Sequence, residues 1–335
     1  MDNVTQVLRM AQAQNGVFTA AQAGNLGVCS YTLSSLVSSA AVRRLARGAY
    51  AVGSAPTRAE DAHIELCRAL LLLYPDAVLA GPSALLAHHL PVWGCGLSRA
   101  LLERPLRRQL SRSGALLRPL SGDAVTTWLG PAVPIATAVV QASQRHGALA
   151  GVVAADQALH SGAVTREQLE MTVAGRLGHR HIQRAHAMLR LSDARSESVG
   201  ESLLRVALTC LGVDLEPQFV VIEQGQVIAR ADFRVRGTRV LLEFDGRVKY
   251  DDGGVEALWR EKKREDRLRR LGWSLVRVTW ADLDRPRLML SWVRAAAALS
   301  GSAPSTGRSR TDGRHTHSHA EVEAPAPNLG PRKRA

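Results

Sequence analysis

Residues 229–246 read ARADFRVRGTRVLLEFDG, and this stretch decides the carboxy-terminal fold. Strand-like residues run up to Arg236 and resume at Arg239 with the apolar run Val240-Leu241-Leu242, a pattern typical of a β-hairpin. A Gly-X pair suits a two-residue type II′ turn, which fixes the register of the two strands. Pairing counted outward from this turn places Asp232 directly opposite Glu243.

Two acids that face each other across a hairpin need a compensating charge. Their Cβ atoms would lie only about 5 Å apart, and like charges at that spacing destabilise a sheet. Asp245 lies on the same face as Glu243, because residues two apart on a strand point the same way. Mg²⁺ takes one or two carboxylates plus water and phosphate oxygens. We therefore expect Asp232, Glu243 and Asp245 to hold Mg²⁺ or Mn²⁺; the alternative is a solvated face on which Arg230 and Arg234 neutralise the acids.

The residues around this hairpin predict a complete carboxy-terminal domain. The expected elements are a helix over 196–211, strands over 217–222, 227–236 and 239–245, a helix over 255–271 and a strand over 273–279. Their order, αβββαβ, is the core arrangement of restriction-endonuclease-like folds.

Five separated blocks in this region carry a resemblance to a known group. They are SVGES (198–202), ADF (231–233), EFDGRVKY (243–250), LWREKKRED (258–266) and LGW (271–273). In this order they resemble the uncharacterised branch of the very-short-patch-repair endonuclease-like group, within the PD-(D/E)XK nuclease superfamily. The resemblance implies that Asp232 and Glu243 take the two central acid positions and Glu201 the acid on the first helix.

The implied chemistry is metal-assisted hydrolysis of DNA phosphodiester bonds, with Glu201 orienting or deprotonating the attacking water. The superfamily usually has a lysine two positions after the second acid, where this chain has Asp245. Lys249, just past the strand, and Lys262 or Lys263, on the next helix, are the candidates to replace it. For each of them the alternative is a solvated surface lysine. Arginine cannot replace lysine in proton transfer, because it stays protonated.

The helix after the acids carries arginines on one side. Arg264 and Arg267 belong to this side, and we expect them to hold the DNA phosphate backbone, which would make binding salt-dependent.

The amino-terminal residues predict a second DNA-binding element. Apolar spacing predicts helices over 4–13 and 20–25 and a third helix capped by Ser30, with a turn at Gly27 before it. Strand-like residues on both sides of Arg47-Gly48 predict a small hairpin. Three short helices followed by such a hairpin make a winged helix-turn-helix.

On double-stranded DNA, the third helix of this unit would enter the major groove and the arginines of the hairpin would meet phosphates. The groove-facing residues are Tyr31, Thr32, Ser34, Ser35 and Ser38, and the phosphate-facing ones are Arg43, Arg44 and Arg47. The alternatives are a solvated helix face and a protein-interaction module.

Three blocks in this region, GVFTAAQA (16–23), LV (36–37) and RGAYAV (47–52), resemble the amino-terminal winged-helix domain of AbiEi-type antitoxins. The resemblance implies binding to promoter DNA and admits a toxin as a protein partner.

The fold class is therefore α+β / α/β, in four regions. They are a winged helix-turn-helix over 1–55, a mostly helical middle over 56–195, the restriction-endonuclease-like domain over 196–290 and a disordered basic tail over 300–335. A membrane span is not expected, since no apolar stretch approaches the ~20 residues needed. The four cysteines are far apart, which argues against a zinc site or a disulfide framework and favours the cytoplasm.

Two functions compete for this architecture. The chain carries 43 lysine and arginine residues against 30 acidic ones, a balance that favours a polyanionic partner. One candidate is a DNA endonuclease targeted by the winged helix. The other is a non-catalytic antitoxin or transcriptional regulator of a toxin–antitoxin system, which keeps a nuclease fold as a structural or interaction module.

Overall fold

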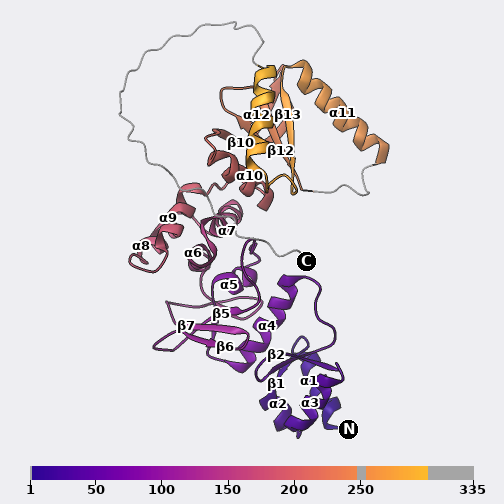
Figure 1. The fold of residues 1–335 in the computed structure, drawn as a ribbon, viewed down its shortest axis with the longest axis vertical. Coiled ribbons are helices and arrows are strands. Elements are labelled where there is room, and N and C mark those ends of the chain that lie inside the picture. Colours follow the sequence, from indigo (N-terminus) through magenta and orange to yellow (C-terminus); the bar gives the residue numbers. More distant parts are fainter. Residues whose placement is uncertain (1, 247–253, 301–335) are drawn as a thin grey trace. The chain divides into compact units, whose positions relative to one another are not determined.

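The computed structural model describes residues 2–246 and 254–300. Within these ranges the chain is a mixed α and β protein with twelve helices and three sheets (Figure 1). The predicted role of Lys249 and the predicted disordered tail beyond residue 300 fall outside the described residues.

The amino-terminal region contains three helices and a three-stranded antiparallel sheet of order β1-β3-β2. In chain order these are α1 (Asn3–Ala13), β1 (Val17–Thr19), α2 (Ala20–Asn25), α3 (Ser30–Ser38), β2 (Val42–Ala46) and β3 (Ala49–Val52). The three predicted helices and the hairpin are present, and β1 is an additional strand. Phe18, Leu33 and Val42 lie in the core that the helices and the sheet share.

Local capping accounts for where these helices begin. Thr19 accepts a hydrogen bond from the Gln22 backbone N–H, and the Gln22 side chain accepts one from the Thr19 backbone N–H. This reciprocal capping box satisfies two donors that the start of α2 would leave without partners. The prediction that Ser30 caps the third helix is wrong. The N-cap is Cys29, and Ser30 is the first helical residue.

The middle region combines helices with a six-stranded sheet of order β6-β7-β5-β4-β9-β8. The helices are α4 (Ala59–Leu73), α5 (Gly81–Ala87), α6 (Ile135–His146), α7 (Ala148–His160), α8 (Arg166–Ala174) and α9 (Ile182–Leu191). The strands are β4 (Val78–Leu79), β5 (Ala100–Arg104), β6 (Leu110–Arg112), β7 (Ala115–Pro119), β8 (Val125–Thr126) and β9 (Pro131–Ala132). The expectation of a mostly helical middle omitted this sheet, whose strands are two to five residues long.

The carboxy-terminal region has a four-stranded sheet of order β10-β11-β12-β13, with the last pair parallel. Its elements are α10 (Val199–Thr209), β10 (Leu215–Glu223), β11 (Gln226–Val235), β12 (Val240–Asp245), α11 (Gly254–Arg270), β13 (Ser274–Thr279) and α12 (Pro286–Ser300). The predicted αβββαβ order is present, followed by α12.

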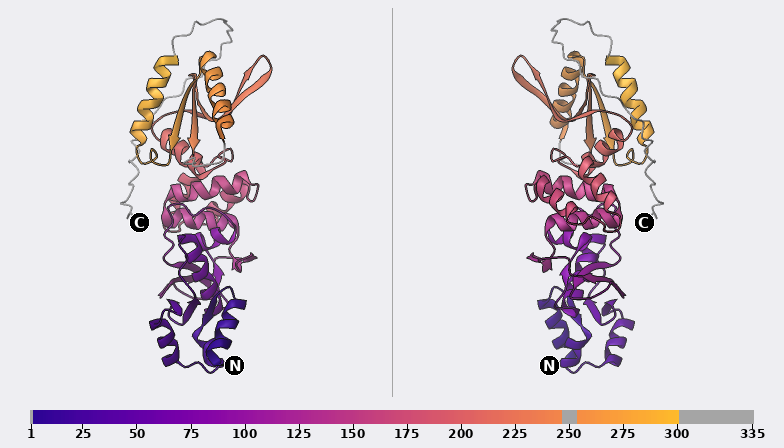
Figure 2. Two further views of the ribbon diagram at one scale, coloured as in Figure 1. Left: turned by 90° about the vertical axis from the view of Figure 1, so that its right-hand side faces the viewer. Right: turned by 90° about the vertical axis from the view of Figure 1, so that its left-hand side faces the viewer.

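Both faces of this sheet are covered by helices (Figure 2). Leu242 of β12 packs in one apolar cluster with Leu204 of α10 and Met289 of α12. Its neighbour Leu241 packs in a second cluster with Leu268 of α11. Successive side chains of β12 therefore point to opposite faces of the sheet, as in any β-strand.

The β11–β12 register agrees with the one predicted from the turn. Phe233 pairs with Leu242 and Val235 with Val240, and Gly237 has the positive φ of +73° that favours glycine. The predicted two-residue type II′ turn is wrong, because residues 236–239 all belong to the turn. The Thr238 side chain donates to the Val235 carbonyl and accepts from the Val240 N–H, so it stabilises a wider turn with the same register.

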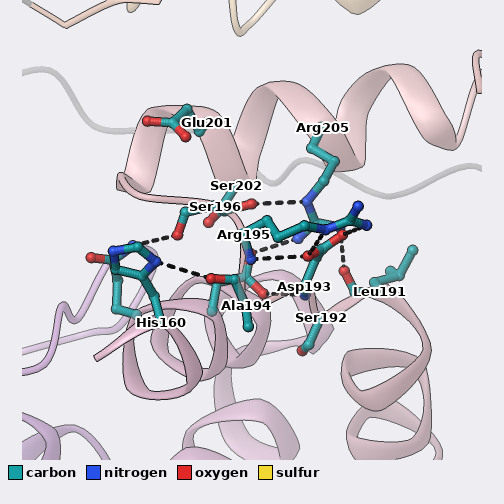
Figure 3. A network of polar contacts seen from close by, with 12 residues as sticks. His160, Leu191, Ser192, Asp193, Ala194, Arg195, Ser196, Glu201, Ser202 and Arg205 are labelled. Atoms are coloured by element: carbon teal, nitrogen blue, oxygen red, sulfur yellow. Dashed lines mark hydrogen bonds and ion pairs between the residues drawn. The ribbon is translucent and has the colours of Figure 1, made fainter. Parts of the chain in front are cut away.

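A buried ion pair joins α7 of the middle region to α10 of the carboxy-terminal region. Arg205 Nη2 lies 2.5 Å from Asp156 Oδ2, and Asp156 is fully buried. Arg205 also donates to the Ser196 hydroxyl and the Leu191 carbonyl (Figure 3). The second Asp156 oxygen accepts from the Asp193 N–H. The pair is therefore surrounded by the hydrogen bonds that a buried pair needs to be tolerated.

Replacing Arg205 with leucine should strongly destabilise the protein, because Asp156 would remain buried without its counter-charge. We expect the free energy of unfolding to fall by about 3–5 kcal/mol. Urea unfolding followed by circular dichroism measures this loss. The matched control is Arg195→Leu, which removes a half-exposed partner of Asp193 and should cost about 1 kcal/mol or less. Equal losses in the two variants would contradict the role given to the Asp156–Arg205 pair.

Candidate functional sites

The outer face of α3 is polar and exposed. Tyr31 is 83% exposed, and Ser34 and Ser35 are also exposed, whereas Leu33 packs inward. Arg44 and Arg47 of the adjacent hairpin are exposed as well. The structure therefore leaves these predicted DNA-binding residues accessible.

Arg43 has a different environment from its two neighbours. Its Nη2 lies 2.6 Å from Glu65 Oε1 on α4, and its Nε donates to the Gly53 carbonyl. These contacts tie the β2–β3 hairpin to α4. The predicted phosphate contact of Arg43 stays a prediction, and it competes with an internal ion pair.

The predicted acid cluster is centred on Asp232, which lies just beyond Phe233–Leu242, the last pair of the β11–β12 register. The predicted pairing of Asp232 with Glu243 stays a prediction. The Asp232 Oδ2 accepts a hydrogen bond of 2.6 Å from the Phe244 backbone N–H. Burial raises the pKa of Asp232 to about 6, and the nearby charges of Glu201 and Glu243 add to the rise while the Phe244 bond opposes it. The charges of Glu201 and Glu243 are therefore close enough to Asp232 to disfavour its ionised form.

Glu201 is 7% exposed on the first turn of α10. Its Oε2 accepts hydrogen bonds from the Glu197 backbone N–H and from Gln218 Nε2. The preceding residue, Gly200, packs directly against the Phe244 ring, and any side chain there would overlap the ring. This contact brings the start of α10 against the end of β12 and accounts for the approach of Glu201 to Asp232.

Glu243 is held by arginines. Both of its oxygens accept from Arg264, at 2.8 and 2.9 Å, and Arg277 Nε lies 3.7 Å away. Arg264 also binds Glu261, and these hydrogen bonds raise the pKa of Arg264 further above its usual range. The sequence did not single out Arg277, whose place beside Glu243 follows from the parallel β12–β13 register.

As arranged, the acids do not fit a divalent cation. Arg264 engages both Glu243 oxygens in a bidentate pair, which already supplies the positive charge that a metal would bring. Among the described residues, no group of three or more His, Cys, Asp or Glu side chains is placed to hold a metal ion. The role of Asp232, Glu243 and Asp245 as metal ligands therefore stays a prediction that this arrangement does not favour.

The other predicted residues of this site are scattered. Asp245 is half-buried at the end of β12, where it pairs with Thr279 in the sheet. Lys262 is exposed, with its Nζ 5.9 Å from the centre of the Trp259 ring. Arg267 Nε lies 2.7 Å from Glu223 Oε2, so this predicted phosphate ligand, like Arg264, has an internal partner.

Comparison with known proteins bears on the amino-terminal region. Residues 6–53 match the family model described as a transcriptional regulator, AbiEi antitoxin. The match runs from α1 to β3 and therefore includes the exposed face of α3 and the hairpin arginines.

Two relatives match a longer stretch of the chain, and neither is named for a function. The chain is 33% identical over 175 residues to two proteins named as uncharacterized, both from Mycobacterium tuberculosis, strains CDC 1551 / Oshkosh and ATCC 25618 / H37Rv. The match covers 52% of this chain and 61% of each relative, so the chain spans about three-fifths of the length of these relatives.

The helices were also compared with the requirements of a membrane span. Among the described residues, no helix is both long and apolar enough to cross a bilayer.

The raised pKa of Asp232 predicts an unusual pH dependence. An acid whose pKa is higher in the folded state than in the unfolded state makes folding take up a proton, so stability falls as the pH rises from about 4 to 6. Asp232→Asn keeps an acceptor for the Phe244 N–H and removes the buried charge. We expect this variant to be more stable than the original at pH 7 by up to about 3 kcal/mol, and close to it at pH 4.

Urea unfolding at both pH values, in buffer containing a metal chelator, measures this difference. Asp266→Asn is the matched control, because it removes an exposed carboxylate of α11. If Asp266→Asn raised the free energy of unfolding at pH 7 as much as Asp232→Asn, the effect could not be assigned to the buried charge of Asp232.

Proposed function

We propose that this chain is a DNA-binding transcriptional regulator of the AbiEi-antitoxin kind and that residues 1–55 form its winged helix. The observation that carries the proposal is the family match over residues 6–53, which coincides with the three helices and the hairpin. A toxin is the protein partner that this proposal implies.

In this proposal α3 enters the major groove and the hairpin follows the backbone. The polar outer face of α3 supplies Tyr31, Ser34 and Ser35 as base-facing residues, since its apolar residues are committed to the core. Arg44 and Arg47 supply the phosphate contacts, because both are exposed and neither has an ion pair within residues 2–246 and 254–300. Arg43 instead holds the hairpin against α4.

We further propose that residues 196–290 are a restriction-endonuclease-like domain that serves as a non-catalytic module. The αβββαβ element order supports the fold. The occupation of Glu243 by Arg264 and the exposed position of Lys262 support the loss of catalysis.

A metal-dependent DNA endonuclease is the second candidate. It is favoured by one observation: burial raises the pKa of Asp232 to about 6, and the charges of Glu201 and Glu243 add to the rise. For this candidate, Arg264 would have to release Glu243 before Mg²⁺ or Mn²⁺ could bind.

The DNA-binding proposal predicts a loss of affinity when the hairpin arginines are removed. Arg44→Ala with Arg47→Ala should weaken binding to a 30-base-pair duplex by roughly tenfold or more, and should reduce the slope of log K against log salt by about 2. Fluorescence anisotropy over a series of salt concentrations measures both quantities. Replacing exposed Arg166 and Arg190 with alanine removes the same amount of charge from α8 and α9. This control should leave the affinity for the duplex and the salt slope nearly unchanged. Equal losses in the two double variants would reject the winged helix as the DNA contact.

An assay of DNA cleavage distinguishes a regulator from an endonuclease. We expect the purified chain to leave supercoiled plasmid intact in Mg²⁺ or Mn²⁺. Cleavage by the original chain that disappears in the Asp232→Ala, Glu243→Ala double variant would establish the endonuclease instead. Cleavage that persists in that variant would point to a contaminant and leave the expectation standing.

A further inference from the structure

A second concave site lies in the middle region, away from the residues considered so far. It is a cavity of ≈ 500 Å³ between β5, β7, α6 and the end of α8. Its polar lining consists of Glu103, Arg118, Ser121, Thr137, Thr172, Arg176 and His179. A volume of this order is typical of pockets for small molecules, which span about 300–1,000 Å³.

The cavity wall contains a buried, fully satisfied polar network. Glu103 is 1% exposed, and its Oε2 accepts from the Ser121 backbone N–H and hydroxyl at 2.9 and 2.7 Å. Its Oε1 accepts from Gln141 Nε2, whose own Oε1 accepts from the Gly81 N–H. Both oxygens of the carboxylate are therefore engaged by the protein. The network holds Ser121 and the end of β7 in place.

Arg176 is built into the same wall. It is 7% exposed, and its Nη2 donates to the Ser121 hydroxyl at 3.1 Å. Burial lowers the pKa of Arg176, the charge of Glu103 opposes this, and the charge of Arg118 lowers it further. A guanidinium that is buried to this extent is costly unless an anion balances it. Glu103 is the acid that acts on Arg176, and Arg118 is its cross-strand neighbour on β7.

Arg118 has no counter-charge of its own. Among the residues that the structure describes, its guanidinium makes neither a hydrogen bond nor an ion pair, although the residue is half-buried. Its charge also lowers the pKa of Arg145, after the larger effect of burial. Two arginines, Arg118 and Arg176, thus line the cavity within electrostatic range of each other, and its one carboxylate, Glu103, is already engaged.

We propose that this cavity binds the phosphate group of a small molecule. Two guanidinium groups and the hydroxyl of Thr137 line the space, whereas the Thr172 hydroxyl donates to the Gln168 carbonyl. A phosphomonoester offers three terminal oxygens and up to two negative charges, which match several donors and the excess of positive charge. A carboxylate has two oxygens and one charge, and so would leave part of this donor set without partners.

The shape of the site favours a small molecule over the DNA backbone. Arg176 is buried in the wall of the cavity, and a terminal phosphate on a small molecule can enter such a space. The phosphates of a duplex are diesters on a wide, convex surface, which exposed arginines such as Arg44 and Arg47 can reach more readily.

Titration calorimetry on the full chain, with inorganic phosphate and then ribose 5-phosphate as probes, tests the proposal. We expect both probes to bind, and acetate at the same ionic strength not to bind. Arg118→Gln should weaken phosphate binding by about tenfold or more, because it removes a charge-assisted donor. Arg107→Gln, which removes an exposed charge outside the cavity, should leave the affinity unchanged.

A second variant separates loss of binding from loss of folding. Thr137→Val keeps the shape of a half-buried side chain, removes its hydroxyl and should weaken phosphate binding while the circular dichroism spectrum stays the same. Equal phosphate affinity in Arg118→Gln and Arg107→Gln, or no binding of either probe, would overturn the proposal. A loss of duplex binding in Arg118→Gln as large as in the Arg44, Arg47 variant would assign the cavity to DNA and also overturn it. The proposed DNA contact of α3 is tested separately, so the two results are distinguishable.

Discussion

Two carboxylates, Asp232 and Glu243, lie close together where the pairing of β11 with β12 ends, and the structure has to compensate both charges. Asp232 is accommodated by the Phe244 N–H, whereas Glu243 is neutralised by Arg264 of α11 and Arg277 of β13. Because these arginines come from the next helix and the next strand, the charge of one residue connects three elements. The acids of this site resemble those of a metal centre. The arginines that neutralise Glu243 instead make it a structural ion-pair network.

The sequence predicted the hairpin of this site but not the residues that neutralise its acids. Gly237-Thr238 indicated the turn, and the register around it follows from strand geometry, so the pairing of Phe233 with Leu242 was predictable before any coordinates. The identity of the counter-charge was not accessible. It depends on how α11 and β13 pack back onto β12, and helical periodicity does not specify which arginine of α11 points at the sheet.

The amino-terminal and middle regions differ in the same way: local sequence signals define the first, and contacts between distant residues define the second. Thr19 with Gln22 and the turn at Gly27 are local signals, and the elements they delimit were predicted close to their observed bounds. The sheet of the middle region was missed because strands such as β4 and β9 are two residues long and owe their pairing to distant partners. The partner of a single side chain could not be predicted either: Arg43 pairs with Glu65, which lies on another element.

The contact between Gly200 and Phe244 limits which residues the first turn of α10 can accept. Any side chain at position 200 would overlap the Phe244 ring. Because Phe244 lies between Glu243 and Asp245 on β12, a larger residue at position 200 would displace the strand segment that carries these acids. The glycine and the aromatic ring therefore form one steric unit, in which a change at either position has to be matched at the other.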